Sequence, residues 1–170
     1  MDASQFVRTQ FAAMRRVSDA VTKDLTDELL NWTPSGTANP IAATLIHTIN
    51  AEDSFIQKMV QGKGQLLWET GDWENKIGLK TLPRKGGGWE EARAGKYAAS
   101  AVLRYQEVVR AATDAYLETL TPGELERQIA MFGNQRPVAD ALAMLVEHTA
   151  HHIGEITALK GMQGAQGMPF

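Results

Sequence analysis

The sequence predicts an all-α fold, and three observations support this prediction. Apolar residues recur at helical spacing in four segments, segments rich in helix breakers separate them, and a long connection, residues 62–88, follows the second segment. The chain has 170 residues, of which 44% are hydrophobic and 22% charged, so it is long enough to bury a core of its own. We expect residues 1–170 to form a single globular domain.

The first two predicted helices follow from periodicity and from breakers. Residues 4–25 carry apolar side chains every three or four positions with polar residues between them, and this helix is expected to end near Thr26. The sequence Asn39-Pro40 supplies an N-cap followed by proline at the first helical position. The second helix is therefore expected to span residues 40–61.

The third predicted helix runs from Trp89 to Leu117. The connection that precedes it is rich in glycine and contains Trp68 and Trp73. An extended chain covers about 3.3 Å per residue and a helix about 1.5 Å, so this connection can cross the full length of the bundle. We therefore expect the second and third helices to run parallel, with the two tryptophans packing the connection back over them.

The last helix is expected between Pro137, which marks a start, and Gly161, which marks a stop. Residues 125–134, before it, fit either a short helix or an extended arm. Residues 161–170, after it, are expected to form a flexible tail.

Composition excludes several classes of function. The formal net charge is −3 at pH 7 with no basic block or basic face, which disfavours binding to nucleic acid or to an anionic membrane. No apolar run approaches the roughly 18 residues of a membrane span, and the first residues do not resemble a signal peptide. The chain has no cysteine, so a thiol would have to come from a cofactor or substrate. A soluble, cytoplasmic protein is expected.

The distribution of histidine is the strongest functional signal. Three of the four histidines are His148, His151 and His152, and the fourth is His47, in the second predicted helix. His148 and His152 are one helical turn apart and point the same way, so both can reach one ion. His47 is then the histidine left to supply a third ligand. Three protein ligands leave one position open for water or substrate, as in catalytic sites.

Each of these residues also has a structural interpretation. A single histidine on the core-facing stripe is more often a hydrogen-bonded core residue, but two neutral rings in register each need partners, and two protonated rings would repel. His47 points away from the main apolar stripe of its helix, alongside small residues, and two interpretations are open: an exposed side chain, or a ligand beside a small cavity. If both faces of that helix are buried, a second subunit is one candidate for the element that packs against one of them.

Glu155 lies one turn after His152 and has three candidate roles: it orients a ligand imidazole, acts as a base on bound water, or becomes a fourth ligand. A surface carboxylate is an equally good interpretation. His151 is rotated about 100° from His152 and is expected to flank the site. Thr149 stands where a zinc-protease motif has glutamate, so protease chemistry is unsupported. Trp68, Trp73 and Trp89 are expected to pack in the core, with a pocket wall as the alternative.

Several segments of the chain resemble the DinB-like proteins of the DinB/YfiT superfamily. Residues 25–32, Asn39-Pro40-Ile41 and His47 resemble the family's entry into its second helix. Residues 148–156 resemble its His-x-x-His-His-x-Gly-[Glu/Gln] signature, and residues 159–164 with Met168-Pro169-Phe170 are similar to a common C-terminal finish. The resemblance spans nearly the whole chain, and the last helix is its most specific part.

The resemblance implies a four-helix bundle with a long crossover between helices 2 and 3. It also implies a divalent metal, usually zinc or nickel, on His47, His148 and His152, and it favours a homodimer. Characterised relatives use the metal to activate low-molecular-weight thiols in transfer or isomerisation reactions. Ile153 stands where an arginine is common in the family, which puts an arginine contact to an anionic substrate in doubt.

Three functions follow as hypotheses. The first is a metal-dependent enzyme acting on a small-molecule substrate, either as a thiol transferase or isomerase, or as a hydrolase with Glu155 as its base. The second is a non-catalytic stress-response protein in which the metal is absent or pins two helices together. A third, weaker hypothesis is a small-molecule sensor that works with a partner.

Overall fold

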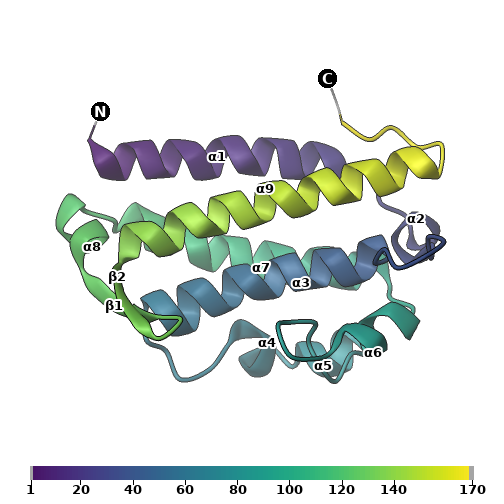
Figure 1. The fold of residues 1–170 in the computed structure, drawn as a ribbon, viewed down its shortest axis with the longest axis horizontal. Coiled ribbons are helices and arrows are strands. Elements are labelled where there is room, and N and C mark those ends of the chain that lie inside the picture. Colours follow the sequence, from purple (N-terminus) through teal and green to yellow (C-terminus); the bar gives the residue numbers. More distant parts are fainter. Residues whose placement is uncertain (1, 169–170) are drawn as a thin grey trace.

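The computed structural model describes residues 2–168, and within this range four long helices lie side by side (Figure 1). They are α1 (Ala3–Thr22), α3 (Ile41–Asp53) continued by the π-helix η1 (Ser54–Val60), α7 (Ala99–Glu118) and α9 (Val138–Met162). α1 and α9 run in one direction, and α3 and α7 run in the other. The all-α fold class is confirmed, and the long crossover joins two parallel helices as predicted.

The first helix is shorter than predicted. α1 ends at Thr22 rather than near Thr26, and the prediction overlooked the short helix α2 (Asp27–Asn31). Thr26 is the N-cap of α2, because its hydroxyl accepts the backbone N–H of Leu29 at 3.2 Å. The threonine that was expected to end one helix therefore begins the next.

α3 is buried on nearly every side by this chain's own elements, chiefly α7 and α9. Its predicted N-cap was wrong: Pro40 occupies that position, and the Asn39 side chain instead accepts a hydrogen bond from Arg93 at 2.5 Å. The predicted end near Gln61 is confirmed, but the sequence gave no sign that residues 54–60 would widen into a π-helix.

The long connection is ordered by α4 (Leu67–Thr70) and α5 (Trp73–Ile77). The buried carboxylate of Asp53 anchors it by accepting the N–H groups of Leu67 at 3.1 Å and Trp68 at 3.0 Å. The Tyr105 hydroxyl donates to the same carboxylate at 2.8 Å. The rings of Trp68 and Trp73 lie 5.2 and 5.4 Å from that of Tyr105, so the expected packing of both tryptophans over the bundle is confirmed.

The predicted third helix is in fact two helices. α6 (Trp89–Ala94) ends at Gly95, and α7 begins at Ala99. A Cβ atom at residue 95 would lie 2.1 Å from the hydroxyl oxygen of Tyr97, so a side chain there would collide with the tyrosine ring. Asn31 holds the break in place, because its amide bonds both the N–H and the carbonyl of Tyr97, at 2.8 and 2.7 Å.

A short helix and a β-hairpin precede the last helix. α8 (Pro122–Glu126) leads into the antiparallel strands β1 (Gln128–Met131) and β2 (Asn134–Pro137), with Ile129 opposite Arg136. Residues 125–134 thus combine both expected forms, but the strand pairing was not predicted. α9 agrees with the predicted fourth helix. Of the predicted tail, Pro169 and Phe170 lie outside the described residues.

The buried lysine Lys160 fixes the end of α9 against the end of α1. Its ammonium donates to the carbonyl oxygen of Val21 at 2.7 Å and to the carboxylate of Asp24 at 2.5 Å. A free carbonyl at the end of a helix is satisfied in this way. Within residues 2–168, none of the helices is both long enough and apolar enough to span a membrane.

Candidate metal centre

α9 places His148 and His152 next to each other. Their ring centroids are 4.5 Å apart, and their Nε2 atoms are 3.2 Å apart. The four-residue spacing on a regular helix is sufficient to produce this arrangement. Both side chains are partly buried at the surface of the bundle.

α3 brings His47 to the same point from a distant part of the sequence. The Nε2 atom of His47 is 3.1 Å from that of His148, and its ring lies 5.0 Å from each of the other two rings. One ligand atom from each histidine lies within 4.8 Å of the others. His47 is therefore part of the cluster, and the interpretation that places it in open solvent is wrong.

The hydrogen bonds on the far side of two rings determine which nitrogen carries the proton. The Nδ1 atom of His47 lies 2.7 Å from the carbonyl oxygen of Pro83, which can only accept, so Nδ1 donates. The Nδ1 atom of His152 donates in the same way to the carboxylate of Glu155 at 2.7 Å. In both neutral rings the lone pair is consequently on Nε2, and both lone pairs face His148.

This arrangement leaves polar atoms unsatisfied unless a cation is bound. His148 has one Nε2–H at most, so it can donate to one of the two neighbouring lone pairs but not to both. Its Nδ1 atom is buried without a hydrogen-bond partner within the described part of the chain. Three converging imidazole nitrogens are a donor set that zinc and nickel accept. The residues therefore fit a metal ion.

The spacing of the nitrogens also fits a metal. Zinc–nitrogen bonds of 2.0–2.1 Å at tetrahedral angles put neighbouring ligand nitrogens about 3.3 Å apart. The two measured Nε2 separations, 3.1 and 3.2 Å, are close to this value. For the third pair, His47 and His152, the ligand atoms lie within 4.8 Å of each other.

Burial favours the neutral form of His148 and His47 by lowering the pKa of each. Desolvation lowers the pKa of His148 to about 4, with a smaller contribution from the charges of His152 and His47. Desolvation also lowers the pKa of His47, partly opposed by the hydrogen bond to Pro83. A neutral imidazole is the form that binds a metal, so burial favours the metal-binding form of these two histidines.

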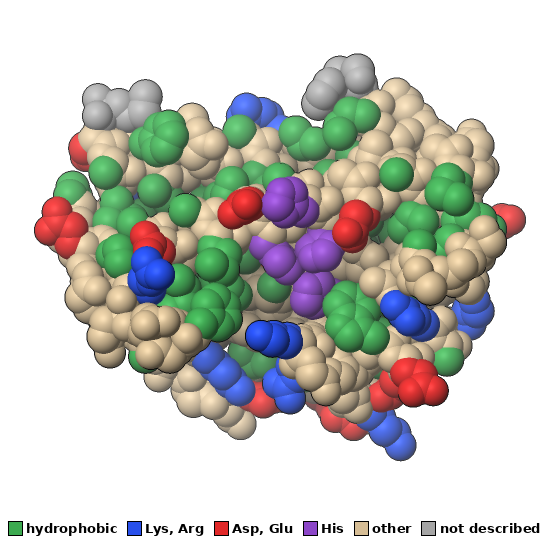
Figure 2. Space-filling model, viewed as in Figure 1, with side chains coloured by type: hydrophobic (Ala, Val, Ile, Leu, Met, Phe, Trp, Pro, Cys, Tyr) green, Lys and Arg blue, Asp and Glu red, His purple; other side chains and the backbone are tan. Residues whose placement is uncertain are grey.

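The histidine side chains gather in the middle of one face of the molecule, with acidic side chains on either side (Figure 2). His151 is exposed and is not part of the three-histidine cluster, as its position on the helical wheel predicts. Glu155 lies against His152, and its side chain is 56% exposed. Ile153, at the position where the family commonly has an arginine, is buried in the core.

The connection before α7 supplies two contacts to His47. The ring of Trp89, the first residue of α6, lies 4.7 Å from the ring of His47, so this tryptophan forms a wall beside the site. The carbonyl of Pro83 orients the same histidine from the other side. Sequence reasoning missed Pro83, because the contact uses its backbone carbonyl, which every residue type carries.

Fold and site together define a helical-bundle protein with a three-histidine centre suited to a metal ion. The model of the DinB superfamily matches residues 10–156. The chain belongs to the DinB superfamily.

Two solved structures share the fold. One is a conserved protein from Enterococcus faecalis, with 19% identity, a TM-score of 0.74, and coverage of 94% of this chain and 96% of that one. The other is a DinB-like protein from Bacillus cereus, with 17% identity, a TM-score of 0.65, and coverage of 96% and 95%. A comparison with curated proteins found no match.

Proposed function

We propose that this protein is a metal-dependent enzyme in which His47, His148 and His152 hold one divalent ion, zinc or nickel, beside a small-molecule substrate. The observation that carries the proposal is the convergence of three Nε2 atoms, with the lone pairs of His47 and His152 both directed at His148. When bound, such an ion lowers the pKa of a coordinated thiol or water, which supplies a nucleophile at neutral pH.

The chain's own residues prepare the site for this chemistry. Pro83 and Glu155 hold the rings of His47 and His152 in the orientation that a ligand needs, and such outer contacts raise the basicity of the imidazole. Trp89 shields one side of His47 from water. Three protein ligands leave a coordination position for the reacting molecule.

A low-molecular-weight thiol is the favoured nucleophile, which makes the protein a thiol transferase or isomerase. The chain has no cysteine, so it offers no thiol of its own that would compete for the ion. Glu155 is engaged with Nδ1 of His152, which supports a role in positioning that ring rather than in removing a proton from water.

Hydrolysis is the second candidate, and one feature of Glu155 favours it. The contact to His152 uses Oε2, and the half-exposed carboxylate also faces a pocket of about 340 Å³ that includes Thr44 and Leu159. Its other oxygen is therefore available to act as the base for an attacking water molecule. The non-catalytic alternative predicts instead that chelation lowers thermal stability while no thiol or ester substrate is turned over.

The decisive experiment compares two histidine variants. Elemental analysis of purified wild-type protein should find one zinc or nickel ion per chain, and His148→Ala should lose both metal and activity. His151→Ala is the matched control, because it removes an exposed histidine from the same helix and should retain both. Activity is sought by screening small thiols with electrophiles and, separately, esters and amides. Retention of stoichiometric metal by His148→Ala would refute the ligand assignment.

A homodimer in the cytoplasm is a further part of the proposal. The two-sided apolar character of α3 does not require a second subunit, because the chain's own helices bury it. The dimer therefore rests on the family resemblance. Sedimentation velocity at several protein concentrations tests it directly.

A further inference from the structure

A partly exposed stripe leads along α3 and η1 away from the histidine cluster. Between residues 41 and 56, the side chains that are not buried are His47, Ala51, Ser54 and Phe55. Their spacing places them on one helical face. Ala51 and Ser54 are small, so they leave space above the helix backbone between His47 and Phe55.

The facing helix, α9, continues the same path. Met144 lies one turn before His148, and Glu147 is the residue directly before His148. The side chains of Met144 and Glu147 are exposed. α9 packs against both α3 and η1. The stripe and this part of α9 therefore form one partly exposed surface that begins at the histidines.

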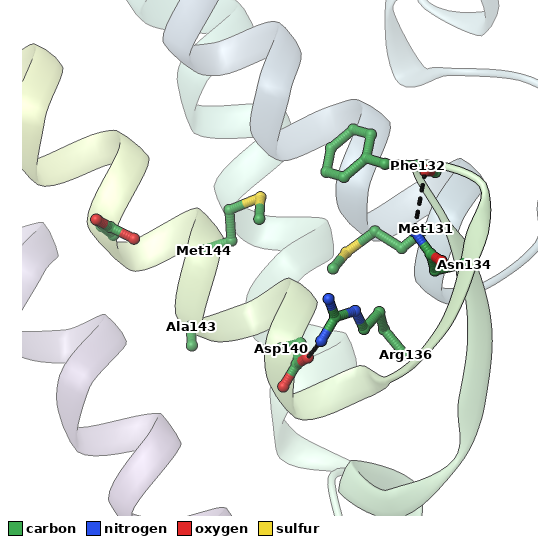
Figure 3. Close-up of a pocket in the computed structure, with 8 residues that line it drawn as sticks. Met131, Phe132, Asn134, Arg136, Asp140, Ala143 and Met144 are labelled. Carbon is green, nitrogen blue, oxygen red and sulfur yellow. Dashed lines mark hydrogen bonds and ion pairs between the residues drawn. The ribbon is translucent and has the colours of Figure 1, made fainter.

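This surface ends at a pocket of about 380 Å³ between α9 and the tip of the β-hairpin. The side chains of Met131, Phe132 and Met144 converge on this space (Figure 3). The ring of Phe132 also meets that of Phe55 edge to face, with centroids 6.2 Å apart, which joins the pocket to the stripe. Asp140, at the far end of the pocket, is eight residues before His148, a helical distance of about 12 Å.

The conformation of the hairpin turn does not favour a phenylalanine at position 132. Phe132 and Gly133 both have positive φ, 51° and 83°, in a two-residue loop between β1 and β2. Such turns favour Asn-Gly, and a bulky residue with positive φ is uncommon. Phe132 is nevertheless 69% exposed. An unfavourable turn residue that exposes an aromatic ring over a pocket indicates a binding role.

The charges that line the pocket favour an uncharged ligand. Arg136 is paired with Asp140 at 3.6 Å, as the dashed line in Figure 3 shows. Glu147 adds a negative charge on the side nearest the histidines. Thioether and aromatic side chains, by contrast, contact aryl and alkyl groups favourably.

We infer that this surface and the pocket at its end bind the uncharged apolar end of the substrate, an aryl or alkyl group carried up to about 12 Å from the atom that reacts at the histidine centre. The inference rests on the proposed function. A second pocket, of about 340 Å³, lies beyond Glu155 and includes Thr44 and Met162. In that direction α3 offers no comparable stripe, since Ala43 and Thr44 are 0% and 1% exposed.

The test uses hydroxamates, which chelate zinc, as anchored probes of this surface and its pocket. Isothermal titration calorimetry on the zinc-loaded protein compares acetohydroxamate, which has no tail, with 6-phenylhexanohydroxamate and with the monohydroxamate of suberic acid, whose tail ends in a carboxylate. The phenyl tail should improve the affinity about tenfold or more over acetohydroxamate, because it buries apolar surface. The carboxylate tail should give little gain.

Three variants locate the tail. Phe132→Asn suits the turn, and Met144→Gln changes an exposed helix position, so neither should disturb folding. Both should remove most of the gain from the phenyl tail and leave acetohydroxamate binding unchanged. Met162→Gln is the matched control, because it makes the same change on the same helix beside the second pocket, and it should retain the gain.

The outcomes separate this inference from the proposed function. If the phenyl tail gives no gain, or if Met162→Gln alone removes it, the inference is overturned while the metal centre stands. If none of the hydroxamates binds the zinc-loaded protein, the centre has no accessible coordination position, and the proposed function fails with the inference.

Discussion

Oε2 of Glu155 lies 2.7 Å from Nδ1 of His152, on the side of the imidazole ring opposite the histidine cluster. The carboxylate therefore holds the proton on Nδ1 and leaves the lone pair of Nε2 directed at His148. A partner of this kind both orients a metal ligand and increases its basicity.

Removal of this carboxylate should weaken metal binding without abolishing it. We expect Glu155→Ala to lower zinc affinity about 10- to 100-fold, measured by competition with a chromophoric chelator, because His152 loses its orienting partner. Glu147→Ala removes another exposed carboxylate from the same helix and should have a much smaller effect. Equal effects of the two variants would mean that general surface charge, not the contact to His152, determines the affinity.

The metal-free protein should lose stability as the pH falls from about 6.5. His148 has its folded-state pKa depressed to about 4, while its unfolded-state value is about 6.5, so between these values the unfolded chain binds more protons. For this histidine the free energy of unfolding should decrease by on the order of 1–2 kcal/mol between pH 6.5 and 5.

Urea denaturation in the presence of a chelator measures this dependence. His148→Gln should flatten the pH profile in that window, whereas His151→Gln, which replaces an exposed histidine, should leave it nearly unchanged. A profile that is as steep in His148→Gln as in the wild type would contradict the assignment.

Asp53 should be among the residues that determine how firmly the connection binds to the bundle. Asp53→Ala removes a buried acceptor of three hydrogen bonds, and we expect it to cost about 3 kcal/mol of unfolding free energy. Tyr105→Phe removes one of the three and should cost about 1 kcal/mol. Proteolysis should cleave residues 62–88 faster in Asp53→Ala than in Tyr105→Phe; equal rates would show that Asp53 does not anchor this segment.

Replacement of Phe132 should stabilise the hairpin turn but weaken binding of the apolar substrate group proposed above. Asparagine tolerates positive φ better than phenylalanine, so Phe132→Asn should raise the free energy of unfolding by about 0.5–1 kcal/mol. Thermal and urea denaturation both report this change. A loss of stability would show instead that the contact between Phe132 and Phe55 contributes more than the turn conformation costs.

The sequence predicts local features of this protein well. The spacing of His148 and His152 fixes their geometry, because a regular helix always places residues four apart on one side. His47 was identified by elimination rather than geometry, since no other histidine remained. Its position 101 residues away in the chain depends on how α3 packs against α9, which periodicity alone does not specify.

The features that escaped prediction depend on contacts across the fold. The break at Gly95 is set by the ring of Tyr97 and the amide of Asn31, a residue on a different helix. The hairpin lacks the Asn-Gly signal that marks such turns, because Phe132 occupies the first turn position. The contact from Pro83 to His47 uses a carbonyl that every residue carries.

The π-helix η1 lets the bundle absorb a change in chain length. Seven residues, from Ser54 to Val60, follow α3 with wider turns than an α-helix has. A π-helical turn holds about one residue more than an α-helical turn, so deletion of a single residue there would let the segment return to α-helical winding without turning the residues that follow it. A homologue one residue shorter at this point would retain its three imidazoles, because none of them lies within the segment, and only the side chains of the segment itself, Phe55 among them, would change their place relative to the hairpin.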